Sequence, residues 1–328
     1  MPVDKESGSA GAPPATATPE SESAAEGDLP RPGADAALLA EFGRQLAGRL
    51  TSGLYLVATP IGNLGDITLR ALTVLARADV IYCEDTRRSH TLLQHFGLRR
   101  PLRQYHEHNA AQQRPFILGA LEEGKSVALI SDAGTPLISD PGFKLVRDVV
   151  AAGHNVVSVP GASAVLTALT SAGLPTDTFM FCGFLPAKSA ARRARLEEFK
   201  RLDTTLVFYE APSRVAEMLR DLAEVLGDRD AAIARELTKL HEEMMRAPLR
   251  ELAQSFTQRE ARGEFVVVVS PPVARDTSDA SIEEALREAL IDMRLKDAAR
   301  KVADALGVPR SRVYDIGLRL KGEQDGTR

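Results

Sequence analysis

The sequence predicts an α/β protein built from two lobes and followed by a small helical module. From Gly53 onward, short β-branched runs alternate with amphipathic stretches, a pattern typical of strands that alternate with helices. The pair Pro271-Pro272 ends this pattern, and the chain from Ser281 to Lys321 has helical periodicity alone. Hydrophobic residues make up 44% of the 328 residues and charged residues 26%, which is the balance of a soluble globular protein.

Residues 1–51 form a separate tail. The first thirty residues are rich in Ala, Pro, Ser, Gly and Glu and hold almost no large apolar side chain. Such a segment cannot bury enough surface to offset its ordering entropy, so we expect disorder, with at most a short helix from Ala34 to Leu50. The N-terminus lacks the pattern of a signal peptide, and no apolar run is long enough to span a membrane. We therefore expect a cytoplasmic protein.

The two lobes are expected over residues 52–174 and 175–272. Nine short apolar runs are candidate strands: Leu54–Ala58, Val80–Cys83, Leu102–Tyr105, Val127–Ser131, Val156–Val159, Phe179–Cys182, Thr205–Tyr209, Ala231–Ala234 and Phe265–Ser270. Helical periodicity fills several of the gaps: Thr68–Arg77, Phe143–Ala152, Ala190–Lys200 and Arg214–Leu226.

The third module is expected over residues 281–321. Its sequence has the layout of a helix-turn-helix motif, with Gly307 at the turn and a small apolar core of Val302, Leu306, Val308 and Val313. Between Arg294 and Lys321 there are eight Lys or Arg and three Asp, a basic surplus in a chain whose formal charge is -4. This local surplus favours contact with nucleic acid.

Three turns rich in Gly and Pro directly follow predicted strands. They are Ala58–Asp66, Ser131–Gly142 and Val159–Ala164. Ligands of open α/β sheets bind at the carboxyl ends of the strands, so we expect these turns to present backbone groups to a ligand, with Gly62 and Gly134 leaving space for it. They fit neither a Walker loop nor a dinucleotide fingerprint, and a plain connection without a ligand is the alternative.

Together, the three turns resemble those of the tetrapyrrole methylase superfamily. Further strings are similar to its ribosomal RNA small subunit methyltransferase I (RsmI) branch: Cys83–Arg87, Tyr105–Asn109, Phe208–Arg214, Ala234–Lys239 with His241-Glu242, and Gly263–Phe265. The resemblance runs from about Gly53 to Pro271. It implies a two-lobed methyltransferase fold, S-adenosylmethionine as methyl donor, a cleft between the lobes and a homodimer. It also implies 2′-O-methylation of a cytidine in the decoding region of 16S ribosomal RNA, with free RNA or the 30S subunit as substrate.

The resemblance also implies which residues contact the donor. Carried over position by position, they are Pro60, Ile61, Gly62, Asn63, Asp132, Ala133, Gly134, Thr135, Pro136, Ile138, Ser139, Tyr209, Glu210, Glu236 and Thr238. An adenine ring and a sulfonium cation need apolar walls with a few fixed polar groups, which backbone atoms of Gly/Pro turns can supply.

The chemical step needs an aligned ribose oxygen and an acceptor for its proton. We predict Glu84 and Asp85, with Arg87, as the catalytic group, because two acids and a base at a strand end rarely serve packing. An ion pair or a helix cap is the structural alternative. His106 and Glu236 are alternates for the same role.

No metal is expected. His106 and His108 stand two apart on an extended segment, but no Cys or further His accompanies them.

Two basic clusters are predicted to contact RNA phosphates. One follows a strand of the second lobe and the other lies in the helical module: Lys188, Arg192 and Arg193, and Arg300, Arg310 and Arg312. Lys and Arg neutralise phosphates and set affinity rather than sequence choice. A solvated charged face is the alternative for either cluster.

Two other functions remain open at this point. The same fold could methylate a corrinoid or porphyrin intermediate, or the α/β part could sense a small ligand for a nucleic-acid-binding regulator. The basic clusters, the helix-turn-helix motif and the Cys83–Arg87 string favour RNA over a tetrapyrrole. Measurable turnover would separate an enzyme from a regulator.

Overall fold

A computed structural model of the protein describes residues 32–257, 259–272 and 277–325. The chain divides into two compact units, residues 1–50 and residues 51–328. In the first unit the described part is helix α1 (Pro32–Ala47), which confirms the short helix predicted there. The disorder predicted for the first thirty residues lies outside the described part of the chain.

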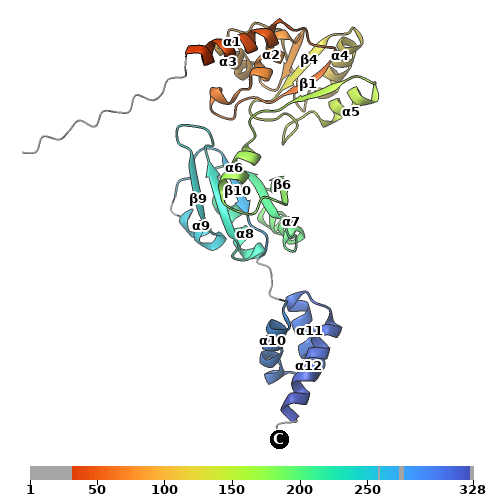
Figure 1. Ribbon diagram of the computed structural model, residues 1–328, viewed down its shortest axis with the longest axis vertical. Helices are drawn as coiled ribbons and strands as arrows, with labels where there is room; N and C mark the ends of the chain where they lie inside the picture. Colours follow the sequence, from red (N-terminus) through yellow and green to blue (C-terminus); the bar gives the residue numbers. More distant parts are fainter. Residues whose placement is uncertain (1–31, 258, 273–276, 326–328) are drawn as a thin grey trace, which may run out of the picture. The chain divides into compact units, whose positions relative to one another are not determined.

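The first sheet is parallel throughout. Its strands, in the spatial order β3-β2-β4-β1-β5, are β3 (Leu102–Gln104), β2 (Val80–Cys83), β4 (Ser126–Ile130), β1 (Gly53–Val57) and β5 (Val156–Val159). The helices that alternate with these strands are α2 (Leu69–Arg77), α3 (Thr86–His95), α4 (Ala110–Glu122) and α5 (Phe143–Ala151), with a short 3₁₀ turn at Leu64–Asp66 (Figure 1). Every residue of β4 is buried, as expected for a parallel strand covered on both faces.

The second sheet is mixed. Its strands, in the order β6-β7-β10-β8-β9, are β6 (Phe179–Phe184), β7 (Thr205–Glu210), β10 (Phe265–Val269), β8 (Asp230–Arg235) and β9 (Glu243–Pro248). β6 and β7 run parallel, and the other neighbouring pairs are antiparallel. The associated helices are α6 (Ala164–Ala172), α7 (Ser189–Phe199), α8 (Val215–Leu226) and α9 (Leu249–Ser255). The two-lobed α/β fold predicted from the sequence is confirmed.

The second sheet buries both of its faces. Alternate residues of its strands, such as Val207 and Val268, pack on α6, where Val165 and Leu169 are buried. The opposite residues pack on α7, α8 and α9. The expected lobe boundary after Leu174 assigns α6 to the first lobe, whereas its apolar face packs on the second sheet.

Strand β9 is not predicted by the sequence pattern. It pairs with β8 in antiparallel register from Arg235↔Glu243 to Asp230↔Pro248. Its residues, Glu-Met-Met-Arg-Ala-Pro, lack both β-branched side chains and clean alternation. An edge strand needs only one partner, so pairing with β8 forms it despite this composition.

The C-terminal module is three helices: α10 (Asp279–Asp292), α11 (Leu295–Leu306) and α12 (Arg310–Asp325). Val302 and Val313 are buried in its core, as predicted, together with Ile282 and Leu286 of α10. Gly307 ends α11 in the left-handed conformation (φ 71°), which confirms the glycine turn between two helices. No helix among the described residues is long and apolar enough to cross a membrane.

Candidate functional site

The strand order brings three Gly/Pro turns together. β4, β1 and β5 are neighbours in the parallel sheet, so the segments that follow their carboxyl ends meet at one edge. Thr59 and Gly134 form an isolated β-bridge, with N–H···O distances of 2.9 and 3.0 Å in the two directions. The Thr135 hydroxyl donates to the Ala162 carbonyl at 3.3 Å, which ties the turn after β4 to the turn after β5. The three turns therefore form one fixed platform.

Two loops at this edge hold unusual backbone conformations. Among the described residues, the non-glycine residues with positive φ are Leu137 and Ser139 after β4, and Glu236 and Thr238 after β8. Such conformations cost about 1–3 kcal/mol each and persist where the surrounding structure fixes them, most often at functional sites. One loop comes from each sheet, so both lobes contribute a strained segment.

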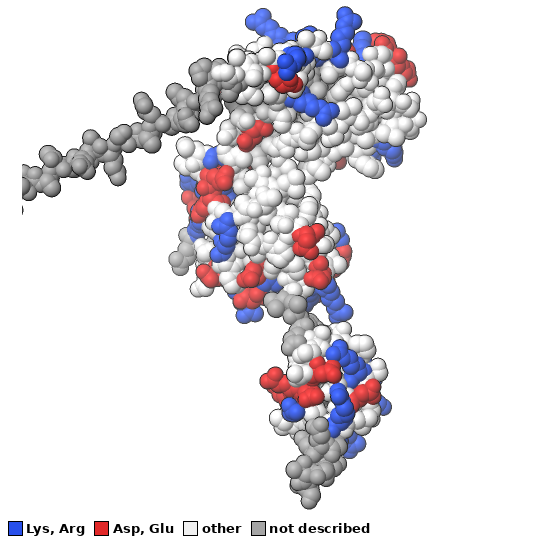
Figure 2. All heavy atoms as spheres, in the orientation of Figure 1, with Lys and Arg blue, Asp and Glu red and all other residues white. Residues whose placement is uncertain are grey.

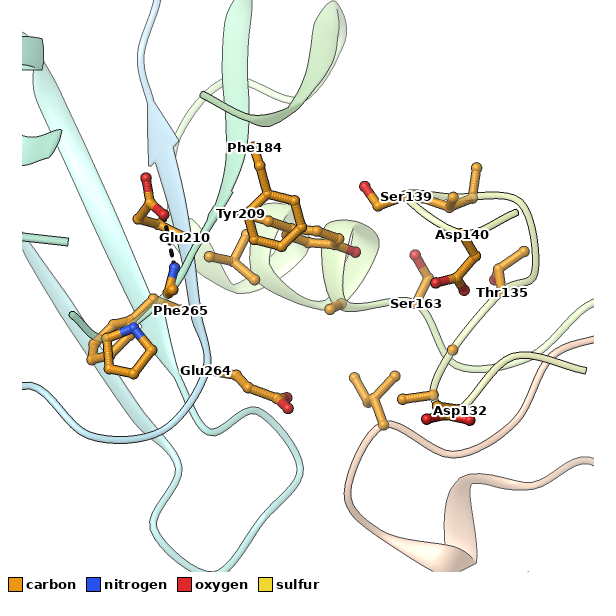
Figure 3. A pocket seen from close by; sticks show the side chains of 18 residues that line it. Asp132, Thr135, Ser139, Asp140, Ser163, Phe184, Tyr209, Glu210, Glu264 and Phe265 are labelled. Atoms are coloured by element: carbon orange, nitrogen blue, oxygen red, sulfur yellow. Dashed lines mark hydrogen bonds between the residues drawn. The ribbon is translucent and has the colours of Figure 1, made fainter. Parts of the chain in front are cut away.

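A cavity of about 410 Å³ lies at this edge; we call it the main cavity (Figure 3). Its lining comes from both lobes: Ile61, Asp132, Ala133, Gly134, Thr135, Ile138, Ser139, Asp140, Ser163, Ala164, Phe184, Tyr209, Glu210, Ala211, Pro212, Glu264, Phe265 and Val266. No Lys, Arg or His is among them, whereas four are carboxylates. The size and the largely apolar lining are those of a small-molecule site.

An aromatic wall closes one side of the main cavity. The rings of Phe184 and Tyr209 pack edge to face with centroids 5.6 Å apart, and Phe181 packs on Tyr209 at 4.9 Å. Burial raises the pKa of Tyr209 to about 12, with the carboxylates of Asp140 and Glu264 adding to the shift. The Tyr209 hydroxyl therefore stays protonated at neutral pH.

The turn after β1 contacts the loop after β8. The Asn63 amide donates to the Thr238 hydroxyl at 3.2 Å, and a Cβ on Gly62 would meet that same hydroxyl at 3.0 Å and clash with the Lys239 side chain. The expected ligand space at Gly62 is therefore filled by the other lobe. A smaller cavity of about 340 Å³ lies on this side, lined by Pro60, Ile61 and Gly62 among others.

Glu236 belongs to a charged network in the second lobe. Its carboxylate accepts from Lys239 Nζ at 2.8 Å and from the Glu264 amide at 3.0 Å. The hydrogen bond from Lys239 lowers the pKa of Glu236. Glu236 lines none of the cavities described here, so this alternate for proton transfer is placed to hold a loop.

The predicted catalytic residues share a separate, more open hollow. It measures about 490 Å³, and we call it the open depression; its lining is Glu84, Asp85, Thr86, Arg87, Gln104, His106, His108 and Asp132. Asp132 also lines the main cavity, so the two hollows adjoin at that residue. The structure thus brings Glu84, Asp85, Arg87 and the alternate His106 together.

Asp85 forms several hydrogen bonds within this depression. Its carboxylate accepts from the Arg87 amide at 2.8 Å, which caps α3, and from Arg87 Nη2 at 2.8 Å. These bonds hold the pKa of Asp85 at about 2. The Asp85 amide donates to Asp132 Oδ1 at 3.0 Å. The helix cap and the ion pair, which are the structural alternative to a catalytic role for this residue, are therefore both present.

The predicted donor residues fall into two groups. Nine line the main cavity: Ile61, Asp132, Ala133, Gly134, Thr135, Ile138, Ser139, Tyr209 and Glu210. Pro60 and Gly62 line the smaller cavity, and Asn63, Pro136, Glu236 and Thr238 line neither. The lining residues absent from the prediction are Asp140, Ser163, Ala164, Phe184, Ala211, Pro212, Glu264, Phe265 and Val266. Of these, Asp140, Ser163 and Ala164 lie inside turns already singled out.

The structure corrects the prediction for Arg192. This side chain is 1% exposed and its Nε donates at 2.6 Å to Oδ2 of Asp221, a residue of α8. A buried, paired guanidinium cannot reach an RNA phosphate. Arg193 is 42% exposed but shares Asp221, whereas Lys188 is exposed.

The basic residues of the C-terminal module are exposed but partly paired. Arg312 donates to Asp279 at 2.7 Å, and Arg300 lies 3.5 Å from Asp297. Arg310 donates to the Lys296 carbonyl at 3.3 Å. On the face shown in Figure 2, basic and acidic side chains are mixed over this module.

Among the described residues, no group of three or more His, Cys, Asp or Glu is arranged to hold a metal ion. The expectation of a metal-free site stays a prediction.

Comparison with known proteins identifies the family. Residues 53–253 match the family described as Tetrapyrrole (Corrin/Porphyrin) Methylases, and residues 276–321 match the RsmI C-terminal HTH domain. The solved structure of the methyltransferase CobJ is 21% identical with a TM-score of 0.51 and covers 69% of this chain and 97% of its own. Cobalt precorrin-4 methyltransferase, CbiF, is 16% identical with a TM-score of 0.50, covering 70% and 96%. At these identities the likeness shows the fold alone.

Two relatives cover most of the chain. The Ribosomal RNA small subunit methyltransferase I of Mesorhizobium japonicum is 50% identical over 282 residues, which are 84% of this chain and 96% of the relative. The protein of the same name from Pseudomonas aeruginosa is 47% identical over 276 residues, 82% of this chain and 98% of the relative. The chain therefore belongs to the tetrapyrrole methylases and, within them, to the ribosomal RNA small subunit methyltransferase I family.

Proposed function

We propose that this protein is an S-adenosylmethionine-dependent methyltransferase that acts on the ribose 2′-oxygen of a cytidine in the decoding region of 16S ribosomal RNA. The observation that carries the proposal is the pairing of two hollows at one sheet edge. The main cavity has the size and lining for a donor molecule, and the open depression beside it is charged and accessible. The names of the relatives support ribosomal RNA as the substrate class.

The main cavity fits an adenosyl sulfonium. Four carboxylates and no basic side chain line it, which suits a ligand that carries a positive sulfur and an ammonium group. The backbone of the turn after β4 is held in place by the Thr59–Gly134 bridge and by the Ser131 hydroxyl, which donates to the Gly134 carbonyl at 3.1 Å. The bound donor supplies an activated methyl group.

We propose that Ala133, Gly134 and Thr135 contact the donor through their backbone groups. Ser163, the N-cap of α6, and Ala164, its first residue, line the same cavity, and Tyr209 provides the aromatic wall. Since the platform is fixed before binding, little ordering entropy is lost when the donor enters. The remaining predicted donor residues outside the lining, such as Asn63 and Thr238, would act by holding the two lobes in register.

The open depression would hold the RNA beside the cavity. Arg87 is 89% exposed in its side chain and is oriented by Asp85, so its guanidinium can reach a phosphate. His106 and His108 lie at the same hollow, with rings 5.9 Å apart. The protein's own part in the chemistry is to align the ribose hydroxyl and to accept its proton. We propose that Glu84 and Asp85 serve this step by positioning the proton acceptor at the acidic edge between the two hollows.

We propose that the chain is organised as an N-terminal tail (1–51), two lobes (52–174 and 175–272) and an RNA-contacting helical module (281–321). Arg300, Arg310 and Arg312 of the module, with Lys188 and Arg193 of the second lobe, would contact phosphates away from the target nucleotide. Arg192 has no part in this role because it is buried.

We further propose a homodimer. Leu166 of α6 is 52% exposed and lines an open groove with Pro160, Thr167 and Thr170. A second copy would cover this apolar position. Light scattering after size exclusion tests the dimer, and a monomer at micromolar concentration would contradict it.

One experiment tests the proposed function. The protein is incubated with methyl-labelled S-adenosylmethionine and, in separate reactions, with 30S subunits, free 16S RNA or porphyrin precursors. We expect label in the RNA of one of the first two, recovered after digestion as 2′-O-methylcytidine. Label in a porphyrin would establish the alternative methylase, and donor binding without transfer to any substrate would favour a regulator.

A further inference from the structure

We propose that Asp140 is the catalytic residue that accepts the proton of the ribose 2′-hydroxyl. The inference deepens the proposed function and rests on it. Asp140 lies in the turn after β4 and is not among the residues predicted from the sequence to contact the donor or to act in catalysis. Its carboxylate lines the main cavity and faces the aromatic wall from the opposite side (Figure 3).

Pairing distinguishes Asp140 from the other acids of the main cavity. Three of the four lining carboxylates have a basic partner: Asp132 with Arg88 at 3.4 Å, Glu210 with Arg214 at 3.0 Å and Glu264 with Lys239 at 3.1 Å. No Lys or Arg among the described residues lies within ion-pair distance of Asp140. A carboxylate without a cationic partner keeps its lone pairs available for an incoming proton.

The backbone holds Asp140 in a defined position. Ser139, the residue before it, has a φ of 65°, and Gly142 has a φ of 147° where α5 begins. A Cβ on Gly142 would meet Leu137 at 3.0 Å, so this turn is closely packed. Strain of this kind is kept where a side chain must be presented in one place.

The charged and titratable groups that face Asp140 come from its own turn and from two other segments. Glu84 follows β2, Asp132 follows β4 and Tyr209 belongs to β7, and the Ser131 hydroxyl also interacts with Asp140. Burial, together with the negative charges of Glu84 and Asp132, raises the pKa of Asp140 to about 6. A base whose pKa lies near the working pH combines a useful ionised fraction with proton affinity.

The competing acids are less suited. Asp85 has a pKa of about 2 because Arg87 and the α3 amide hold its carboxylate. Glu84 lines the open depression rather than the main cavity, where the methyl group would lie. Its negative charge beside Asp140 makes it a positioning residue, because it tunes the acceptor without meeting the reacting atoms.

The step balances without a further reactant. The hydroxyl O–H bond breaks and its proton passes to a carboxylate oxygen of Asp140. The freed electron pair forms the O–CH₃ bond while the methyl–sulfur bond breaks, and that bonding pair stays on sulfur as the neutral thioether. The proton then leaves Asp140 to solvent.

A pH series on the full-length protein tests the assignment. Single-turnover methyl transfer to the RNA substrate is measured from pH 5 to 8.5 with saturating donor. We expect the wild-type rate to fall about tenfold per pH unit below about 6 as the acceptor becomes protonated. A rate that stays level down to pH 5 would overturn the proposal without any variant.

Asp140→Asn provides the second arm, with exposed Asp203→Asn as the matched control. We expect Asp140→Asn to lose about 10²–10⁴-fold in rate, to lose the acid limb and to keep its donor affinity by calorimetry. Glu84→Gln should shift the limb to lower pH with a smaller loss of rate. Asp203→Asn should match the wild type.

The outcomes separate the two proposals. Wild-type transfer to RNA with an unimpaired Asp140→Asn would leave the function standing and refute the role of Asp140. Loss of the acid limb in Glu84→Gln but not in Asp140→Asn would assign the proton to Glu84 instead. Failure of the wild type on every RNA would overturn the function and this inference with it.

Discussion

The main cavity and the open depression adjoin at Asp132 yet are built in opposite ways. The main cavity is lined by Gly/Pro turns, small side chains and one aromatic wall, and its backbone is cross-linked before any ligand arrives. The open depression is lined almost wholly by charged and polar side chains on the ends of β2 and β3. The first suits a small molecule that must be held the same way each time. The open depression suits a polyanion, whose binding depends mainly on charge.

The contrast predicts a separation of effects. Changes to the platform should alter donor affinity, whereas changes to the depression should alter RNA affinity or rate and leave the donor alone. A platform substitution that altered RNA affinity, or a substitution in the depression that altered donor affinity, would show that the two hollows act as one site.

Gly134→Val should have the largest effect. The φ of 76° at Gly134 disfavours any Cβ, and that Cβ would stand 3.2 Å from Ile61 Cγ2. The strain of about 1–3 kcal/mol displaces the turn, so we expect donor affinity to fall about 100-fold, as measured by calorimetry. Gly153→Val, at a positive φ in open space remote from the cavity, controls for strain alone. Equal donor affinity in a folded Gly134→Val protein would remove this turn from the site.

Deletion of residues 277–328 should have the next largest effect. The truncated protein loses the exposed arginines of the helical module, each worth up to about 1 kcal/mol against a phosphate. We expect the RNA Michaelis constant to rise about tenfold with unchanged donor affinity. Deletion of residues 1–50 is the control and should change neither. Full activity of the C-terminal truncation at physiological salt would show the module to be dispensable.

Arg87→Ala should have a smaller effect on the same quantity. One exposed guanidinium against a phosphate is worth about 1 kcal/mol, so the RNA Michaelis constant should rise up to about fivefold with little change in rate. Exposed Arg77→Ala is the matched control. A fall in rate without a change in Michaelis constant would instead place Arg87 in the chemical step.

The smallest expected effect is on the melting temperature of the Asp140→Asn variant. The folded-state pKa of about 6 lies above the ordinary 3.8, so the folded protein binds the proton more tightly between these values. Stability is therefore lost as pH rises through this window, and the penalty is complete at pH 7.5. We expect Asp140→Asn to melt about 2–4 °C higher than the wild type at pH 7.5, with the difference shrinking toward pH 4. A lower melting temperature at pH 7.5 would mean that the charge stabilises the fold.

Much of the fold follows from the sequence because its strands are short apolar runs bounded by Gly, Pro and Asp. β4, for example, is apolar except at its first residue and ends at the turn that forms the platform. β9 escapes prediction because its composition is not that of a strand, and pairing with β8 decides its structure. α6 is assigned to the first lobe by position, but packing on the second sheet depends on contacts distant in sequence.

In the candidate site, too, features set by local sequence are predicted, whereas features set by contacts distant in sequence are not. Backbone turns such as that at Gly134 are visible as local composition, so much of the platform can be predicted. The sequence does not predict which charged side chain lacks an ion-pair partner, because those partners come from other elements of the fold. In the sequence Arg192 is indistinguishable from its neighbour Arg193, yet its side chain is buried against Asp221 of α8. Asp140 has the sequence context of an ordinary turn residue, yet it lacks the cationic partner that the other carboxylates of the main cavity have.

A crystal structure of the protein with S-adenosylhomocysteine would show directly where the donor binds. We predict ligand density in the main cavity, between the Ala133–Thr135 turn and the Tyr209 wall, with the open depression left free. Density in the open depression, against Asp85 and Arg87, would contradict it.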